Sequence, residues 1–317
     1  MWKYTGTKEC NDFLLSLHLF EYKDEKKYIK TLYSITNKID SNYKRYKIKK
    51  SNGKSRTIYE PSALLKEIQK NILTNILNYK SISKYAKGYK KGLSLKDNAI
   101  PHINQKNILK LDIKNFFESI SFLNIYNSCF SIEYFPKSVG MLLTYLCTYN
   151  DHLIQGAPTS AYISNLVMKE FDEELGVWCD KNKIVYTRYS DDMTFSGNLN
   201  PHEVILKVKK MLSQIGLELN KSKIHVVNRN FSQRVTGLVV NEKVQVSSKY
   251  RREIRKEIYY IMKFGLSSHL KKLNIQVGPE KYLKKLYGKI LYVLQIDKEN
   301  QEFLKYKEII NKLAKHH

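Results

Sequence analysis

The sequence predicts an α+β fold, in which short strands and helices alternate along the chain. Apolar residues recur at every second position in some segments and with a helical period in others, which indicates strands and helices respectively. Two pairs of strand-like segments meet across tight turns, as in β-hairpins. Hydrophobic residues make up 42% of the 317, so the composition excludes a disordered or fibrous chain.

The charge balance favours a polyanionic partner. Lys and Arg number 55 against 30 Asp and Glu, a formal net charge of +25. So positive a field attracts nucleic acid or an anionic membrane surface. Part of the excess is also what the codon bias of an AT-rich genome produces, since 47 of the 55 are lysine.

Membrane, secretory and disulfide classes fit poorly. No run of about twenty apolar residues is present, and Met1–Gly6 lacks the pattern of a signal peptide. We therefore expect a cytoplasmic protein with no membrane partner. Cysteines occur at four distant positions, for which we expect free thiols rather than a zinc site or disulfides: Cys10, Cys129, Cys147 and Cys179.

The first predicted elements are a hairpin and a helix. Strand-like residues 46–50 and 56–59 flank Ser51-Asn52-Gly53-Lys54, and Asn-Gly at such a position predicts a hairpin turn. Glu60-Pro61-Ser62 then predicts the start of a helix over 63–78, whose apolar residues keep a helical period.

The middle of the chain alternates both kinds of element. We predict strands over 108–113, 184–189, 193–196, 224–227 and 235–240, and helices over 159–179 and 201–215.

The C-terminal part is the more basic part. Residues 241–317 hold 18 Lys and Arg against 8 Asp and Glu. Within it, 248–264 predicts an amphipathic helix with an apolar stripe and a basic remainder. We expect four of its residues to bind RNA by its phosphates: Arg251, Arg252, Arg255 and Lys256. The alternative is a solvated basic face.

Two adjacent carboxylates mark the candidate chemistry. Asp191 and Asp192 lie at the tip of the predicted hairpin 184–196, where we expect no salt-bridge partner close in sequence. Two like charges there repel unless a cation neutralises them, and oxygen ligands suit Mg²⁺. An Asp-Asp pair is also ordinary turn chemistry.

A third carboxylate favours the metal interpretation. Asp112 interrupts the apolar strand 108–113 and lies 79 residues before Asp191. A carboxylate at the end of a buried strand needs a partner, and a metal shared with Asp191 and Asp192 would supply it.

These segments resemble the reverse transcriptases, and among them the retron enzymes. Tyr189-Ser190-Asp191-Asp192 resembles the Tyr-x-Asp-Asp box, Leu111–Ile120 the first catalytic box, and Gln155–Ser160 the Gln-Gly-x-Pro-x-Ser box. Two further segments resemble signatures of the retron branch, with the residues Asn98 and His102 in one and Val235, Thr236 and Gly237 in the other. Asn115 departs from the acidic residue of many relatives, so we assign it no metal.

The resemblance implies a right-hand polymerase. Fingers are expected over 1–107 and 125–150, a palm over 108–124 and 151–240, and a basic helical thumb over 241–317. Two Mg²⁺ ions would be held by Asp112, Asp191, Asp192 and the Ile113 carbonyl, with Lys223 as a catalytic proton donor. The nucleotide-binding residues would be Lys54, Arg56, Phe117 and Gln155. Alternatives stay open for three of these residues: His102 as a turn residue, Phe117 as core, and Lys223 as a solvated charge.

The implied activity is RNA-directed DNA synthesis. A retron enzyme would copy part of a structured non-coding RNA with dNTPs into a branched RNA–DNA hybrid (msDNA), in antiviral defence with a separate effector protein. Two rivals remain: another prokaryotic reverse transcriptase, of group II intron-like or non-retron defence type, and an RNA-binding module with a dead site.

Overall fold

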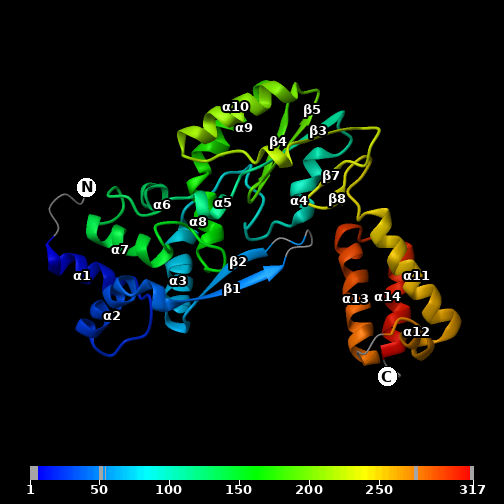
Figure 1. Ribbon diagram of the computed structural model, residues 1–317, viewed down its shortest axis with the longest axis horizontal. Coiled ribbons are helices and arrows are strands. Elements are labelled where there is room, and N and C mark those ends of the chain that lie inside the picture. Colours follow the sequence, from blue (N-terminus) through cyan, green and yellow to red (C-terminus); the bar gives the residue numbers. More distant parts are fainter. Residues whose placement is uncertain (1–5, 50–52, 54, 275–277, 315–317) are drawn as a thin grey trace. The chain divides into compact units, whose positions relative to one another are not determined.

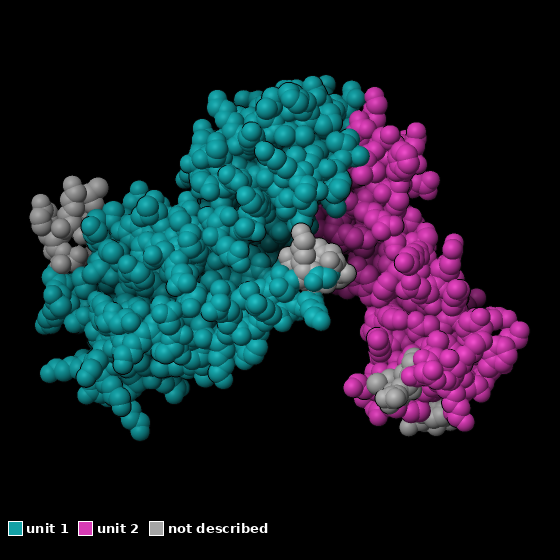
Figure 2. All heavy atoms as spheres, in the orientation of Figure 1, with its two compact units in different colours: residues 1–93, 109–226 teal, residues 94–108, 227–317 magenta. Residues whose placement is uncertain are grey.

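The computed structural model describes residues 6–49, 53, 55–274 and 278–314. It contains both helices and antiparallel strand pairs, which confirms the α+β class (Figure 1). The chain divides into two compact units, residues 1–93 with 109–226 and residues 94–108 with 227–317 (Figure 2). We call them unit 1 and unit 2. All four cysteines are free and buried, as expected.

Unit 1 begins with helices and the predicted hairpin. Strands β1 (Tyr43–Lys49) and β2 (Ser55–Pro61) pair antiparallel. Ser62 caps the following helix α3 (Ala63–Asn75), because its hydroxyl accepts a hydrogen bond from the Leu65 amide. The helix ends three residues earlier than predicted and is followed by a 3₁₀ turn, Leu77–Tyr79. The other helices of this part are α1 (Thr7–Ser16), α2 (Glu25–Asn37), α5 (Phe116–Ser119), α6 (Phe122–Cys129) and α7 (Lys137–Cys147).

A four-stranded sheet follows, in the order β4-β5-β3-β6. Its members are β3 (Asn107–Asp112), β4 (Val185–Tyr189), β5 (Asp192–Gly197) and β6 (His225–Asn228). Apolar side chains of β3, β4 and β5 enter one core with helices α8 (Ser160–Val167), α9 (Lys169–Lys181) and α10 (Pro201–Gln214). The sheet thereby fixes where β3 ends and where β4 turns into β5.

Two predicted elements were wrong in form. The helix expected over 159–179 is two helices, because Met168 leaves helical geometry at ψ +1°. The strand expected over 235–240 is a small hairpin of β7 (Arg234–Val235) and β8 (Leu238–Val239). Thr236 and Gly237 have φ of +45° and +85°, so the chain turns between the strands. Apolar periodicity continues through both breaks and does not reveal them.

Unit 2 combines two distant parts of the sequence. Helix α4 (Leu95–Ala99) and the 3₁₀ turn Ile100–His102 belong to it with the β7–β8 hairpin. Its other helices are α11 (Ser248–Phe264), α12 (Leu266–Lys272), α13 (Pro279–Ile296) and α14 (Gln301–Ala314). The bounds of α11 are those predicted, and its apolar stripe lies in the core of the unit. Unit 2 thus adds 94–108 and 227–240 to the predicted thumb, and the division into fingers, palm and thumb stays a prediction.

The two segments that resemble retron signatures pack together in unit 2. The Thr236 hydroxyl donates to the Leu95 carbonyl at 3.4 Å, and the Asn104 amide to the Val240 carbonyl at 3.0 Å. His102 is fully buried, and burial lowers the pKa of its imidazole to about 3. The imidazole is therefore neutral at ordinary pH and belongs to the core.

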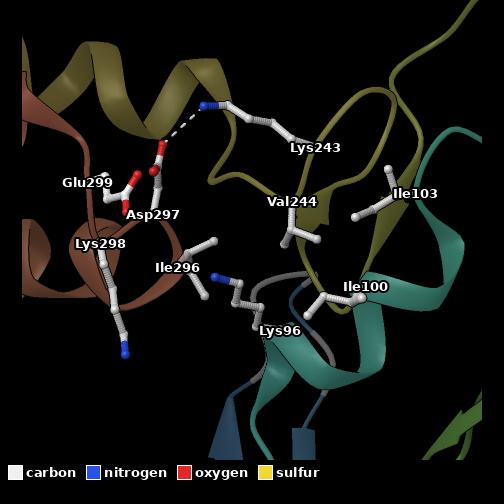
Figure 3. Close-up of a pocket in the computed structure, with 9 residues that line it drawn as sticks. All are labelled: Lys96, Ile100, Ile103, Lys243, Val244, Ile296, Asp297, Lys298 and Glu299. Atoms are coloured by element: carbon white, nitrogen blue, oxygen red, sulfur yellow. Dashed lines mark hydrogen bonds and ion pairs between the residues drawn. The ribbon is translucent and has the colours of Figure 1, made fainter.

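A cavity of about 400 Å³ opens on the same unit (Figure 3). Ile100, Ile103, Val244 and Ile296 contribute apolar side chains to it, and Lys243 reaches across to Asp297 at 3.3 Å. It contains none of the predicted catalytic residues. Among the described helices, none is long and apolar enough to cross a membrane.

The burial of His102 predicts acid sensitivity. The pKa is about 3 in the folded chain and 6.5 for an ordinary histidine. The unfolded chain therefore binds the extra proton between these values, and stability falls as pH drops below 6.5. Between pH 7.5 and 5 we expect wild type to lose about 2 kcal/mol of unfolding free energy through this group.

Chemical denaturation at both pH values measures this loss. His102→Gln should remove it, while the same change at exposed His202 should retain it. An equal acid loss in wild type and His102→Gln would contradict the prediction.

Candidate active site

The end of β3 and the β4–β5 turn bring the three carboxylates together. Asp112 is the last residue of β3 and is 4% exposed. The Ile113 amide donates to the Asp191 carbonyl at 3.0 Å, which ties β3 to the turn. On its other side, the Asn220 amide donates to the Asp112 carbonyl at 2.8 Å. Backbone hydrogen bonds thus position all three acids from sequence-distant segments.

The turn itself is tight. Tyr189 pairs with Asp192, so only Ser190 and Asp191 form the loop. Ser190 has a φ of +60°, a conformation rare for residues other than glycine. The turn therefore places Asp191 and Asp192 at the same end of the sheet as Asp112.

The site carries excess negative charge. Burial raises the pKa of Asp191, and the charge of Asp112 raises it further. Burial also raises the pKa of Asp192, followed by the charge of Asp191. Both carboxylates therefore resist ionisation, first because they are buried and second because their neighbours are negative. A bound cation would relieve this cost.

Lys223 lies against this cluster. Its Nζ lies 2.5 Å from Asp112 Oδ2, and the Asn220 side-chain amide donates to Asp112 Oδ1 at 3.3 Å. Burial lowers the pKa of Lys223, but the hydrogen bond and charge of Asp112 outweigh it and raise the pKa overall. The ammonium is thus firmly protonated and half exposed.

The carboxylate oxygens of Asp112, Asp191 and Asp192 are the donor type that a hard cation prefers, but they are not arranged as three ligands around one metal position. Within the described part of the chain, no group of three His, Cys, Asp or Glu has a metal-holding arrangement. Both carboxylate oxygens of Asp112 instead have partners within the protein, Lys223 and Asn220. The oxygen-only donors and the raised pKa of Asp191 and Asp192 still fit Mg²⁺.

The paired phenylalanines after β3 differ in environment. Asn115 has a φ of +46° and starts the short helix α5. Phe116 is 4% exposed in the core, whereas Phe117 is only partly buried. Phe117 therefore keeps a surface available to a ligand.

The Gln155 loop is fixed to the β1–β2 hairpin. The Tyr59 amide donates to the Gln155 carbonyl at 2.9 Å. Gly156 has a φ of +118°, and a Cβ there would lie 2.3 Å from the Tyr59 carbonyl oxygen. Only glycine fits this approach. Arg56 is exposed on β2, and Lys54 lies outside the described residues.

The four basic residues predicted to bind RNA divide into two sets. The Arg255 guanidinium makes two hydrogen bonds of 2.6 Å to the Glu302 carboxylate, and Arg251 is half-buried. Arg252 and Lys256 are exposed. Arg255 is therefore paired within the protein, through the contact of α11 with α14. The helix period predicts α11 but does not predict that contact.

Sequence reasoning missed a buried polar network beneath the turn. Arg188, on β4, is fully buried and forms a 2.6 Å ion pair with Asp172 of α9. Its guanidinium also donates to the Ser190 carbonyl at 2.9 Å. The available signal was a basic residue inside an apolar strand, two positions before the turn.

Comparison with known proteins identifies the family of this chain. The chain matches the family described as reverse transcriptase (RNA-dependent DNA polymerase) over residues 48–261. It is 30% identical over 295 residues to the retron Ec86 reverse transcriptase of Escherichia coli, covering 90% of this chain and 86% of that one. The chain belongs to the retron-type reverse transcriptases.

Two further relatives agree. The retron Ec83 reverse transcriptase of Escherichia coli is 32% identical over 278 residues, which cover 78% of this chain and 88% of that one. The retron Mx65 reverse transcriptase of Myxococcus xanthus is 30% identical over 234 residues, which cover 67% and 54%. This retron-type reverse transcriptase is an RNA-directed DNA polymerase with the right-hand polymerase fold, and its substrates are an RNA template and nucleotides.

Gly156 is crowded by Tyr59 whereas Gly288 has open space, so alanine should have opposite effects at the two positions. Gly156→Ala should lower the melting temperature, because the new Cβ meets a backbone oxygen at an unfavourable φ. Gly288→Ala, in the middle of α13 with nothing within 4 Å, should stabilise by about 0.5–1 kcal/mol. Calorimetry checks both, and equal melting temperatures for the two variants would contradict the assigned contact.

Proposed function

We propose that this enzyme is the polymerase of a retron and copies part of one structured non-coding RNA into DNA, giving a branched RNA–DNA hybrid (msDNA). The observation that supports this most is the convergence of Asp112, Asp191 and Asp192 at the end of β3. The length of the match to two retron enzymes supports the retron branch. The two segments that resemble retron signatures, Asn98–His102 and Val235–Gly237, pack in one unit, which also supports the retron branch.

Asp112, Asp191, Asp192 and the Ile113 carbonyl would hold two Mg²⁺ ions, which when bound supply charge stabilisation for nucleotidyl transfer. Lys223 supplies a proton at Nζ for the departing pyrophosphate. The raised pKa of Lys223 keeps the proton on Nζ while Asp112 is its partner. The departing pyrophosphate is a stronger base than the Asp112 carboxylate, and it takes the proton when it replaces Asp112 as the partner of Lys223.

Nucleotide selection falls to residues around the site. Phe117 lies beneath the incoming sugar, where a flat ring leaves no room for a 2′-hydroxyl. Gln155, on its loop, and Arg56, on β2, contact the nucleotide. The hydrogen bond from the Tyr59 amide to the Gln155 carbonyl holds this loop against β2. Lys54, which lies outside the described residues, is proposed for the triphosphate by resemblance alone.

Phe117→Val should relax sugar selection. The smaller side chain opens space beneath the sugar, so incorporation of rNTP relative to dNTP should rise at least tenfold while DNA synthesis persists. Phe116→Leu serves as a core control and should leave the ratio unchanged, since Phe116 is buried. An unchanged ratio in Phe117→Val would assign Phe117 to the core.

RNA capture falls to the exposed face of α11. Lys249, Arg252, Lys256, Tyr259 and Lys263 follow one another at spacings of three and four residues, and all are exposed. Tyr259 is 55% exposed and available to stack, whereas Tyr250 packs edge-on against Tyr292. This face presents cations and one exposed ring to an RNA stem-loop.

Removing three of these charges should flatten the salt dependence of RNA binding. Each phosphate contact contributes about 0.7–0.9 to the slope of log affinity against log salt, so Lys249→Gln with Arg252→Gln and Lys256→Gln should reduce it by about two. The matched control changes the exposed Lys298, Lys305 and Lys312 to Gln. Equal slopes in both triple variants would show that α11 does not hold the RNA.

We further propose that the enzyme acts in the cytoplasm in antiviral defence, with a separate effector protein. The experiment that tests the proposed function is sequencing of the nucleic acid that copurifies with the expressed protein and its native flanking DNA. A single RNA joined to DNA through a bond that survives denaturation and yields to debranching enzyme is expected. DNA without a branched RNA would indicate another reverse transcriptase class, and RNA alone, with no primer extension, a dead binding module.

A further inference from the structure

A fully buried arginine lies directly beneath the turn that carries Asp191 and Asp192. Arg188 Nε donates to Asp172 Oδ1 at 2.8 Å, and Nη2 donates to Asp172 Oδ2 at 2.6 Å. The same Nη2 donates to Asn165 Oδ1 at 3.1 Å. Nη1 donates to the Ser190 carbonyl at 2.9 Å. One planar guanidinium thus joins helices α8 and α9 to the backbone of the turn.

The partners of Arg188 are themselves fixed. Asp172 is fully buried and also accepts a 2.8 Å hydrogen bond from the Tyr186 hydroxyl. Asn165 is fully buried and donates to the Gly88 carbonyl at 2.8 Å. Segment 85–89 lies along the end of β4, where the Lys87 amide donates to the Arg188 carbonyl. The acceptors that hold the guanidinium therefore cannot move far.

The turn needs such support. Ser190 has a φ of +60°, a conformation that costs about 1–3 kcal/mol and persists only where the surroundings hold it. The Tyr89 hydroxyl contacts the Ser190 hydroxyl at 3.3 Å, and a Cβ on Gly88 would lie 3.0 Å from the Ser190 amide nitrogen. On the far side, the Asp191 carbonyl accepts from Ile113. The Arg188 contact supports the turn from the side of helices α8 and α9.

Stability alone explains this network poorly. Replacing a buried ion pair with apolar residues of similar volume is often neutral or stabilising. A buried guanidinium with several fixed acceptors instead gives direction, because its donors lie in one plane. The geometry therefore favours a role in orienting the Ser190 turn over a role in stabilising the fold.

We propose that Arg188, oriented by Asp172 and Asn165, is a positioning residue that holds the Ser190 carbonyl and thereby sets the placement of Asp191 and Asp192 for catalysis. This inference rests on the proposed function, because it takes those two carboxylates as the reacting site. Arg188 touches no substrate. It acts through the turn.

Arg188→Lys tests the proposal most directly. Lysine keeps the charge opposite Asp172, but a single ammonium cannot reach Asp172, Asn165 and the Ser190 carbonyl with the same planar geometry. Because a displacement of about 1 Å can cost about a hundredfold in rate, we expect kcat to fall at least tenfold. The KM for dNTP should stay within threefold, and the Mg²⁺ concentration for half-maximal rate should rise. Each kcat is normalised to the fraction of molecules that bind RNA, so unfolded protein does not count.

A control and a second variant separate positioning from folding. Tyr85→Phe removes a 2.6 Å hydrogen bond to Asp180 on the same helix α9 without touching the turn, and should keep wild-type kcat. The combined change Arg188→Met, Asp172→Leu and Tyr186→Phe makes the network apolar. We expect it to recover the melting temperature lost in Arg188→Met alone, but not kcat. Mn²⁺ binding, measured by electron paramagnetic resonance, should be weaker than in wild type both in Arg188→Lys and in the apolar triple variant.

Three results would overturn the proposal: wild-type kcat in Arg188→Lys, recovery of kcat together with melting temperature in the apolar variant, or a kcat loss in Tyr85→Phe equal to that in Arg188→Lys. The proposed catalytic site fails differently. If Asp191→Asn keeps DNA synthesis, the carboxylates are misassigned. If Asp191→Asn is inactive and Arg188→Lys is fully active, only the positioning role is wrong.

Discussion

Like charges repel, and the end of β3 gathers three carboxylates that burial makes still more costly to ionise. Asp191 and Asp192 both have raised pKa values for this reason. The fold must therefore hold the acids together against their own repulsion. It does so with backbone hydrogen bonds on both sides of Asp112, with the ammonium of Lys223 above it, and with a buried guanidinium beneath the turn. This excess of negative charge supports the proposed binding of a cation here.

The surrounding elements serve this arrangement. The apolar residues of β3 anchor one acid in the core, and the short β4–β5 turn presents the other two. The Gln155 loop approaches β2 so closely that residue 156 must be glycine, which joins the predicted nucleotide-binding loop to the hairpin that carries Arg56. Unit 2 contributes a different chemistry. Its helix α11 buries an apolar stripe and leaves a row of cations in solvent.

Local chemistry allowed the sequence to predict much of this. The Asn-Gly turn predicts the first hairpin, the period of Tyr250, Ile254, Ile258 and Ile261 predicts α11, and two motifs predict the acids at the site. What the sequence did not predict depends on contacts between distant residues. The break at Met168 and the turn at Thr236 leave the apolar pattern intact. The pairing of Arg255 with Glu302, and of Arg188 with Asp172, requires knowing which helices pack together.

We propose that the carboxylates at the end of β3 support nucleotidyl transfer, while other residues hold the RNA. Asp191→Asn tests it most directly, because the amide keeps the size of the side chain and removes its charge. Primer extension on an RNA template and RNA affinity should be measured on the same preparation, beside Asp12→Asn as an exposed charge control. We expect Asp191→Asn to lose at least a hundredfold in extension rate and to keep an RNA affinity within threefold of wild type. Near-wild-type extension by Asp191→Asn in Mg²⁺ would contradict it.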